Sequence, residues 1–306
     1  MRTKSPITNK ENVTKIKTIE VSWIINQWKR QAKYDVSYLF KGIKTIELFR
    51  CNDTGYMFFE PSIEGDSTLY EHLQTSSWYY MPWKWEHEIA LMYIKDNINL
   101  LEIGCAEGHF LDTIRKDYKI NVAGIETNSL AVKRAREKGL IIYEEFIKYH
   151  SLHNSLKYDI ICSFQVLEHI SDVKKFINSS LECLKPNGFL IISVPNNLSF
   201  ISEFDEILLM PPHHVGFWDE HSLQKIPSFF NMTFESIFKE PLQKYHEGFF
   251  RSNIYKKIFG NLYTNKLTGR LLRFLFLRPF IDKHLTYFSK WVIGHTILAV
   301  YRKAGD

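Results

Sequence analysis

The sequence has few cysteines, no long apolar run and little excess of charge of either sign. The four cysteines lack the close spacing of metal ligands, which favours free thiols in a reducing cytoplasm; they are Cys51, Cys105, Cys162 and Cys183. No uninterrupted apolar segment approaches the length that spans a bilayer, and the Lys-rich N-terminus lacks the apolar core of a secretory signal. The formal charge of +5 does not by itself indicate a nucleic-acid partner.

The remaining composition is that of a globular protein with room for a catalytic domain. Hydrophobic residues make up 45% and charged residues 24% of the chain, which supports a sizeable core. A length of 306 residues fits a catalytic domain with additions better than one minimal domain. Aromatic residues reach 15%, so many large flat side chains are available to form pockets.

Residues 1–77 predict a small N-terminal lobe made of a helix and a β-hairpin. Segment 13–40 has the pattern of an amphipathic helix followed by a loop. Its expected core contacts are Ile24, Ile25 and Trp28. Segment 43–59 predicts two short strands around the turn Asn-Asp-Thr-Gly at 52–55.

From residue 98 the pattern changes to strand, glycine turn and helix in regular alternation. The expected strands are 99–103, 122–125, 140–143, 158–163, 189–194, 232–238 and 296–301, and the expected helices are 82–94, 109–116, 129–138 and 171–184. Such alternation predicts a doubly wound α/β fold with a seven-stranded, mainly parallel sheet covered on both faces. The expected domain plan is a lobe at 1–77, a core at 78–241, a basic aromatic helical insert at 242–291, and the last strand and tail at 292–306.

The loop after the first core strand, residues 101–108, carries the main functional signal. In open α/β sheets ligands bind beyond the carboxyl ends of the strands, and glycine lets a cofactor approach the backbone closely. The G-x-G-x-x-G spacing of nicotinamide sites is absent, because Ala106 lies between the two glycines of the loop. Glu102 precedes the first glycine, and a carboxylate there suits a cationic ligand better than a pyrophosphate. A second acid, Glu126, closes the next strand, where it can accept hydrogen bonds from both ribose hydroxyls.

The loop resembles motif I of class I S-adenosylmethionine (SAM)-dependent methyltransferases, Glu/Asp-x-Gly-x-Gly-x-Gly, with Ala106 at the middle glycine. Val-Ala-Gly-Ile-Glu-Thr-Asn at 122–128, Tyr-Asp-Ile-Ile-Cys-Ser-Phe-Gln-Val-Leu-Glu-His at 158–169 and Leu-Lys-Pro-Asn-Gly at 184–188 match the later motifs in order and spacing. The resemblance covers residues 97–197 and implies SAM as the cofactor. The residues that it implies for SAM binding are Glu102, Gly104, Cys105, Ala106 and Gly108 toward the methionine, Glu126, Thr127 and Asn128 around the ribose, Glu144 (or Glu145) at the adenine, and Gln165 and Val166 beneath the sulfonium. The alternative is a glycine turn of another nucleotide-binding α/β domain.

The residues after the fourth core strand indicate a small-molecule acceptor. Enzymes that methylate amino groups of DNA bases usually carry Asn/Asp-Pro-Pro-Tyr/Phe there, whereas this chain has Ser-Phe-Gln-Val at 163–166, which disfavours a nucleic-acid substrate. Val-Leu-Glu-His at 166–169 resembles small-molecule and sugar methyltransferases, including the ubiquinone-biosynthesis O-methyltransferases. The segments 194–197 and 210–221 are similar to a group found in glycan and secondary-metabolite pathways.

The N-terminal segment 48–61 resembles the lead-in of sugar methyltransferases whose Cys-x-x-Cys belongs to a zinc-binding lobe. In this chain Thr54 stands where the second cysteine after Cys51 would be. We therefore expect the lobe to keep its shape without zinc, and we expect no metal in the site.

Histidines near the expected methyl position are the candidate catalytic groups. Methyl transfer from a sulfonium is an in-line displacement that depends on near-attack positioning, and a hydroxyl acceptor also needs a base. Because histidine titrates in the right range, we expect His214 to be the base, with His169 as the second candidate and His213 as a substrate contact. Packing or capping at a helix start is the alternative for His169, and a structural role is the alternative for one of the pair His213 and His214. Tyr80 and Trp85 are the expected aromatic contacts of the acceptor, with core packing as the alternative.

The basic, aromatic segment 256–290 allows two interpretations. It can lie on an anionic membrane surface and reach a lipid-like acceptor, or it can cap the substrate pocket with its cations in solvent. We favour the cap, because Pro279 limits the helix and the apolar residues are not confined to one face. Three functions stay open: methylation of a sugar or glycan-pathway intermediate, O-methylation of a lipid-like aromatic such as a quinol precursor, and SAM binding without methyl transfer. The expected location is cytoplasmic, and peripheral at the membrane in the second case.

Overall fold

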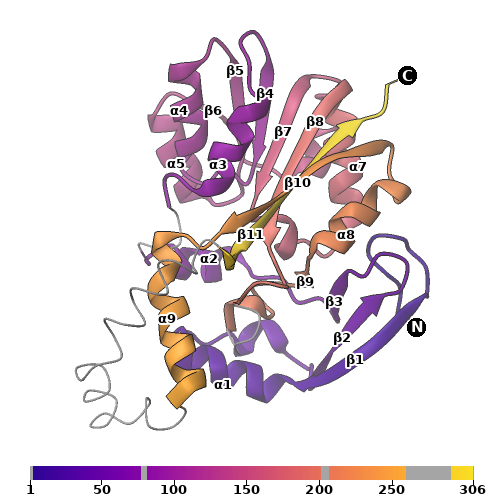
Figure 1. The fold of residues 1–306 in the computed structure, drawn as a ribbon, viewed down its shortest axis with the longest axis vertical. Helices are drawn as coiled ribbons and strands as arrows, with labels where there is room; N and C mark the ends of the chain where they lie inside the picture. Colours follow the sequence, from indigo (N-terminus) through magenta and orange to yellow (C-terminus); the bar gives the residue numbers. More distant parts are fainter. Residues whose placement is uncertain (1–2, 77–80, 201–206, 260–290, 306) are drawn as a thin grey trace.

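The computed structural model describes residues 3–76, 81–200, 207–259 and 291–305. Its large sheet has seven strands (Figure 1). In spatial order these are β10 (Met232–Pro241), β11 (Ile293–Lys303), β8 (Leu184–Pro195), β7 (Tyr158–Phe164), β4 (Asn99–Ile103), β5 (Asn121–Ile125) and β6 (Ile141–Tyr143). The strands from β8 to β6 run parallel, and β11 is antiparallel to both of its neighbours. This arrangement confirms the predicted doubly wound, mainly parallel sheet.

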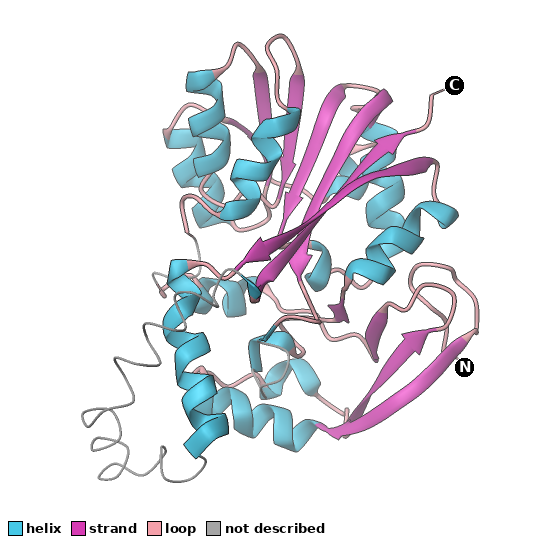
Figure 2. Cartoon of the chain, viewed as in Figure 1, coloured by secondary structure: helices cyan, strands magenta, loops and turns pink. Residues whose placement is uncertain are grey.

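Helices cover both faces of this sheet (Figure 2). The α-helices are α1 (Val21–Gln31), α2 (Ser67–Leu73), α3 (Trp85–Ala90), α4 (His109–Asp117), α5 (Ser129–Glu137), α6 (Ile147–His150), α7 (Val173–Cys183), α8 (Glu220–Lys225) and α9 (Lys244–Phe259), and the short 3₁₀ turns are η1 (Ser37–Phe40), η2 (Leu91–Tyr93), η3 (Leu167–His169), η5 (Ile207–Leu209) and η6 (Ile226–Phe229). Buried side chains of α3, α4 and α5 form one apolar cluster on one face, and those of α6, α7 and α8 join a second cluster. Since both faces are covered, the central strands are almost continuously apolar.

A second sheet of four strands forms much of the N-terminal lobe. In spatial order its strands are β1 (Val13–Glu20), β2 (Thr45–Cys51), β3 (Met57–Glu60) and β9 (Gly216–Phe217). The antiparallel pairing of β2 with β3 confirms the predicted hairpin, and Gly55 in its turn has a φ of 79°. The last strand was not predicted: β9 comes from the loop after β8, so that two residues of the segment 78–241 complete the sheet of the lobe.

The expected helix at 13–40 is wrong for its first eight residues. These residues form β1, which pairs antiparallel with β2, and the helix begins only at Val21. Valine, threonine and isoleucine alternate with lysine in this stretch, and β-branched residues favour a strand. Within α1, Ile24 and Trp28 are fully buried and Ile25 is partly buried against the same cluster.

Other boundaries differ by a few residues. Helix α3 begins at Trp85 and not at Pro82, and the expected turn at 185–188 lies inside the continuous strand β8. The expected insert begins with α9, whereas residues 260–290, which contain Pro279, lie outside the described residues. Within the described ranges, no helix has both the length and the apolar character needed to cross a bilayer.

The lobe and the large sheet meet where the parallel strands end (Figure 1). The amide of Val215 donates to the carbonyl of Glu168 at 2.9 Å, and the carbonyl of Val215 accepts from the amide of Phe59 at 3.0 Å. Trp28 of α1 donates its indole N–H to the carbonyl of Pro211 at 3.2 Å. The segment between β8 and β9 is therefore held between the lobe and the loop after β7.

Candidate functional site

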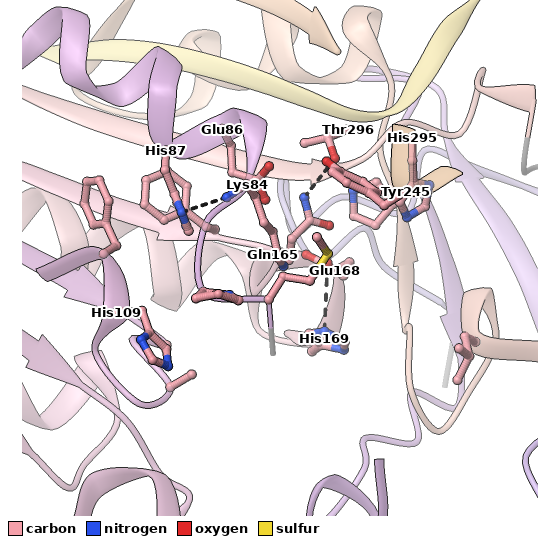
Figure 3. Close-up of a pocket in the computed structure, with 18 of the residues that line it drawn as sticks. Lys84, Glu86, His87, His109, Gln165, Glu168, His169, Tyr245, His295 and Thr296 are labelled. Carbon is pink, nitrogen blue, oxygen red and sulfur yellow. Dashed lines mark hydrogen bonds and ion pairs between the residues drawn. The ribbon is translucent and has the colours of Figure 1, made fainter. Parts of the chain in front are cut away.

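A cavity of about 510 Å³ lies at the carboxyl edge of the large sheet. Its walls come from the start of α3, the loop after β4, the end of β7 with η3, the segment before β9, the start of α9 and the first residues of β11. Figure 3 shows side chains from several of these segments directed into one space. This is the edge at which open α/β sheets bind ligands.

The predicted cofactor loop forms one wall of the cavity, and its backbone explains its small residues. Gly104 has a φ of 74°, and a Cβ atom there would lie 2.4 Å from Cγ2 of Val166. Gly108 has a φ of 72°, and a Cβ atom there would lie 2.3 Å from Cδ1 of Leu140. Ala106 also has a positive φ, 45°, which costs an alanine on the order of 1 kcal/mol. The position usually held by the middle glycine therefore keeps the left-handed conformation.

Glu126 is held beside this loop at the end of β5. Its carboxylate accepts hydrogen bonds from the amides of Ala106 at 2.9 Å, Thr127 at 2.7 Å and Asn128 at 2.8 Å. Burial raises the pKa of the Glu126 carboxyl, and these three amides oppose the rise. Glu126 is not among the residues that line the cavity, but it is hydrogen-bonded to the backbone of Ala106, which does line it.

Glu102, by contrast, lines the cavity and is almost completely buried, with 5% of its surface exposed. Its Oε2 atom has no hydrogen-bond partner among the described residues. Burial raises the pKa of this carboxyl to about 8, and the nearby charge of Glu126 contributes to the rise. A cationic ligand in the cavity would favour the ionised form of Glu102.

The residues predicted around the ribose and adenine already have partners within the protein. The side-chain oxygen of Asn128 caps α5 by accepting from the amides of Leu130 at 3.0 Å and Ala131 at 3.2 Å. The carboxylate of Glu144 accepts from the hydroxyl of Ser129 at the start of the same helix. Their contacts with SAM stay predictions, and the structure adds a structural role for each.

Gln165 lies at the centre of the cavity (Figure 3). Its backbone has a φ of 56°, and its amide nitrogen contacts Oγ of Ser193 at 3.4 Å and Oγ1 of Thr296 at 3.5 Å. The neighbouring Val166 packs against Gly104 of the cofactor loop. The loop after β7 therefore meets the loop after β4, as the motif positions imply.

The structure brings together the three histidines that the sequence suggested separately. The ring centroids of His169 and His213 lie 4.6 Å apart, those of His169 and His214 lie 4.9 Å apart, and those of His213 and His214 lie 4.6 Å apart. All three line the cavity. Burial lowers the pKa of His169 to about 4 and the pKa values of His213 and His214 well below the usual range, so the rings are neutral.

Several lining residues were missed by sequence reasoning. Glu86 and Glu168 are each only 1% exposed, and Tyr245 comes from the segment expected to be an insert. His295 and Thr296 are the third and fourth residues of β11. Because β11 is antiparallel, its beginning lies at the carboxyl edge of the parallel strands, and this topological argument was available from the predicted fold.

The structure describes one of the two aromatic residues proposed as acceptor contacts, and that one, Trp85, is not among the residues that line the cavity. Tyr80 lies outside the described residues. Trp85 packs, partly buried, against the apolar cluster below α3 and α4, while its neighbours Glu86 and His87 line the cavity. In the lobe, Cys51 and Thr54 are both fully buried.

Comparisons with known proteins agree with this geometry. Residues 77–233 match the family model described as a methyltransferase domain. The mitochondrial ubiquinone biosynthesis O-methyltransferase of Dictyostelium discoideum is 26% identical over 145 residues, which cover 41% of this chain and 45% of the relative. The ubiquinone biosynthesis O-methyltransferase of Histophilus somni is 32% identical over 122 residues, 35% of this chain and 51% of the relative. The chain thus spans about half the length of the curated relatives it matches.

Among solved structures, that of the cyclase SpnF is similar to this fold, with a TM-score of 0.50 and 13% sequence identity over 72% of this chain and 80% of that one. A likeness at this identity concerns the fold alone. The family match is the stronger finding, because it spans just over half of the chain and includes the loops after β4, β5 and β7. The chain belongs to the methyltransferase domain family, and its fold and cofactor loop are those of the class I SAM-dependent methyltransferases.

Proposed function

We propose that the protein transfers the methyl group of SAM to a hydroxyl group of a sugar or glycan-biosynthesis intermediate. The observation that carries this proposal is that one cavity is lined both by the cofactor loop and by the histidine cluster. The acceptor oxygen forms a bond to the methyl carbon while the carbon–sulfur bond breaks, which leaves S-adenosylhomocysteine. The hydroxyl proton passes to a base, for which His214 is the first candidate and His169 the second.

The buried acids of the cavity favour an acceptor that is rich in hydroxyl groups. Among the described residues, neither carboxylate oxygen of Glu86 has a hydrogen-bond partner. Burial raises the pKa of this carboxyl, and the nearby charge of Lys84 opposes the rise. Unpaired buried acceptors are costly, and a sugar supplies several donors to them.

The beginning of α9 supports the cap interpretation of the segment 242–291. Tyr245, His246 and Phe249 of this helix line the cavity. The hydroxyl of Tyr245 donates to Oε1 of Glu240 at 2.6 Å, which ties the helix to the end of β10. We therefore propose that the beginning of α9 covers the acceptor.

A second candidate is O-methylation of a lipid-like aromatic, and the names of the ubiquinone biosynthesis relatives favour it. In this case 256–290 would contact a membrane; residues 260–290 of it lie outside the described residues. Co-sedimentation with anionic liposomes, with and without this segment, separates the two candidates. SAM binding without methyl transfer is the third candidate, and formation of S-adenosylhomocysteine excludes it.

The main experiment incubates the protein with radiolabelled SAM and a panel of sugars, nucleotide sugars and catechols. We expect label in a sugar-type acceptor, and we expect His214→Ala to lower turnover by about 100-fold or more with unchanged SAM affinity. His153→Ala, at an exposed position away from the cavity, is the matched control. Full activity of His214→Ala would exclude this residue, and SAM binding without label in any acceptor would favour the third candidate.

A further inference from the structure

The histidine cluster has a geometry that a single catalytic base does not require. His169, His213 and His214 each offer one ring nitrogen, and these atoms all lie within 4.8 Å of one another. Nitrogen ligands lie about 2.0 to 2.1 Å from a zinc ion, so nitrogens around one ion are about 3 to 4 Å apart. The separation of up to 4.8 Å is above this range, so binding one ion would require the rings to move closer together.

The tautomers of two of the rings are set by backbone carbonyls. Nδ1 of His169 lies 2.5 Å from the carbonyl oxygen of His213, and Nδ1 of His213 lies 2.7 Å from the carbonyl oxygen of Leu208. Because a carbonyl only accepts hydrogen bonds, each Nδ1 carries the proton, and Nε2 is the nitrogen with the lone pair. Metal-binding histidines are oriented in this way, with the second ring N–H donated to a carbonyl or carboxylate.

A buried carboxyl group lies beside one of the three rings, that of His169. Glu168 is 1% exposed, its Oε2 has no hydrogen-bond partner among the described residues, and its Oε1 lies 3.9 Å from Nε2 of His169 (Figure 3). A buried carboxyl oxygen without a hydrogen-bond partner is costly, and a bound cation would give it a partner. This is a second observation, independent of the histidine geometry, that indicates a cation.

We propose that His169, His213 and His214 bind a divalent transition-metal ion, and that the neighbouring carboxylate of Glu168 offsets part of its charge. Imidazole ligands favour zinc, iron or nickel over magnesium and calcium, which prefer oxygen ligands. The cluster lines the cavity, so the ion keeps a coordination position open toward the acceptor. From the sequence alone we expected no metal in the site, and we now propose one there instead.

The consequence of the ion rests on the proposed function, since the acceptor is taken to occupy the same cavity. A metal ion that binds the acceptor oxygen lowers the pKa of its hydroxyl group and orients it toward the methyl group. With the ion bound, the three histidines would act as ligands and His214 would not be the base assigned above, so the hydroxyl proton would leave to water.

The test uses Co²⁺ and Zn²⁺ as probes on the full chain after removal of metal with a chelator. Co²⁺ binding is followed by its visible absorption, which reports nitrogen coordination, and Zn²⁺ binding by equilibrium dialysis with elemental analysis. We expect one ion per chain for the wild type and for the control His153→Ala. Changes next to a ligand cost about 10- to 100-fold in metal affinity, so His214→Ala should bind at least about 100-fold more weakly. Glu168→Gln, which keeps the side-chain volume, should weaken binding by about 10- to 100-fold.

Wild-type protein that takes up neither ion, or a His214→Ala variant that binds both as the wild type does, would overturn the proposal. If circular dichroism shows that His214→Ala does not fold, His169→Gln at the partly exposed ring replaces it with the same expectation. SAM binding to the metal-free protein is measured in parallel by calorimetry. SAM binding without metal uptake refutes only the metal site, and metal uptake without methylation of any acceptor refutes only the proposed function.

Discussion

Replacing Glu102 by glutamine tests the electrostatics of the cofactor site. The carboxyl of Glu102 is buried, and its pKa rises from 4.5 to about 8, because burial disfavours the charged form. Glutamine has nearly the same shape and carries no charge at any pH. The variant therefore removes the ionisation and leaves the packing in place.

The sign of the effect follows from proton binding. Below pH 4.5 this carboxyl is protonated in both the folded and the unfolded chain, so it adds no pH dependence. Between pH 4.5 and about 8 the unfolded chain loses the proton and the folded chain keeps it, so the free energy of unfolding decreases as the pH rises. At 1.36 kcal/mol per pKa unit, the whole interval corresponds to about 5 kcal/mol.

Urea unfolding at pH 5, 6.5 and 8, without SAM, measures this difference. We expect Glu102→Gln to be more stable than the wild type by less than about 1 kcal/mol at pH 5 and by several kcal/mol, up to about 5, at pH 8. Saturating SAM should stabilise the wild type more than the variant at pH 8, because a cation favours ionised Glu102. Parallel pH profiles of the two proteins would refute the assigned pKa shift, and equal stabilisation by SAM would refute the cationic contact.

Two further substitutions test the cofactor loop. Glu126→Ala removes the acceptor of three backbone amides and the predicted contact with the ribose. Hydrogen bonds to charged groups contribute about 1.5 to 3 kcal/mol each, so SAM affinity, measured by calorimetry, should fall by about 10- to 100-fold. The exposed Glu137→Ala on α5 is its control, and unchanged affinity of the Glu126 variant would contradict the assignment. Gly104→Ala places a Cβ 2.4 Å from Val166 in a left-handed backbone, so thermal unfolding should show a loss of about 2 to 4 kcal/mol. Adding Val166→Ala removes the side chain that the new Cβ would meet, so it should restore part of the lost stability. A double variant no more stable than Gly104→Ala would contradict a clash between these two side chains.

The core of the fold could be predicted because its signals are local. Each central strand is an apolar run that ends in a polar or glycine turn, and each crossover helix follows directly in the sequence. The lobe was harder, since residues 13–20 alternate in a way that fits either a short strand or the start of a helix, and only pairing with β2 decides between them. β9 has two residues and no sequence pattern of its own, so its pairing with β3 could not be foreseen.

Some residues of the candidate site could likewise be predicted from local motifs, and others could not. Glu102, Gly104 and Gln165 were found because they belong to motifs that follow single strands, and all three line the cavity. Glu86 and Tyr245 were not found, because their place in the cavity depends on how the start of α3 and the start of α9 fold over the sheet edge. Non-local packing of this kind leaves no spacing to recognise in one sequence.

The pairing of β9 with β3 has a practical consequence for protein engineering. The peptide segment that carries His213 and His214 is bonded on one side to Phe59 of the lobe and on the other to Glu168 of the core. A graft that exchanges only the first 77 residues would therefore sever the edge strand from its sheet and loosen these histidines. A functional chimera needs to carry residues 207–221 along with the lobe, because the two segments are hydrogen-bonded within one sheet.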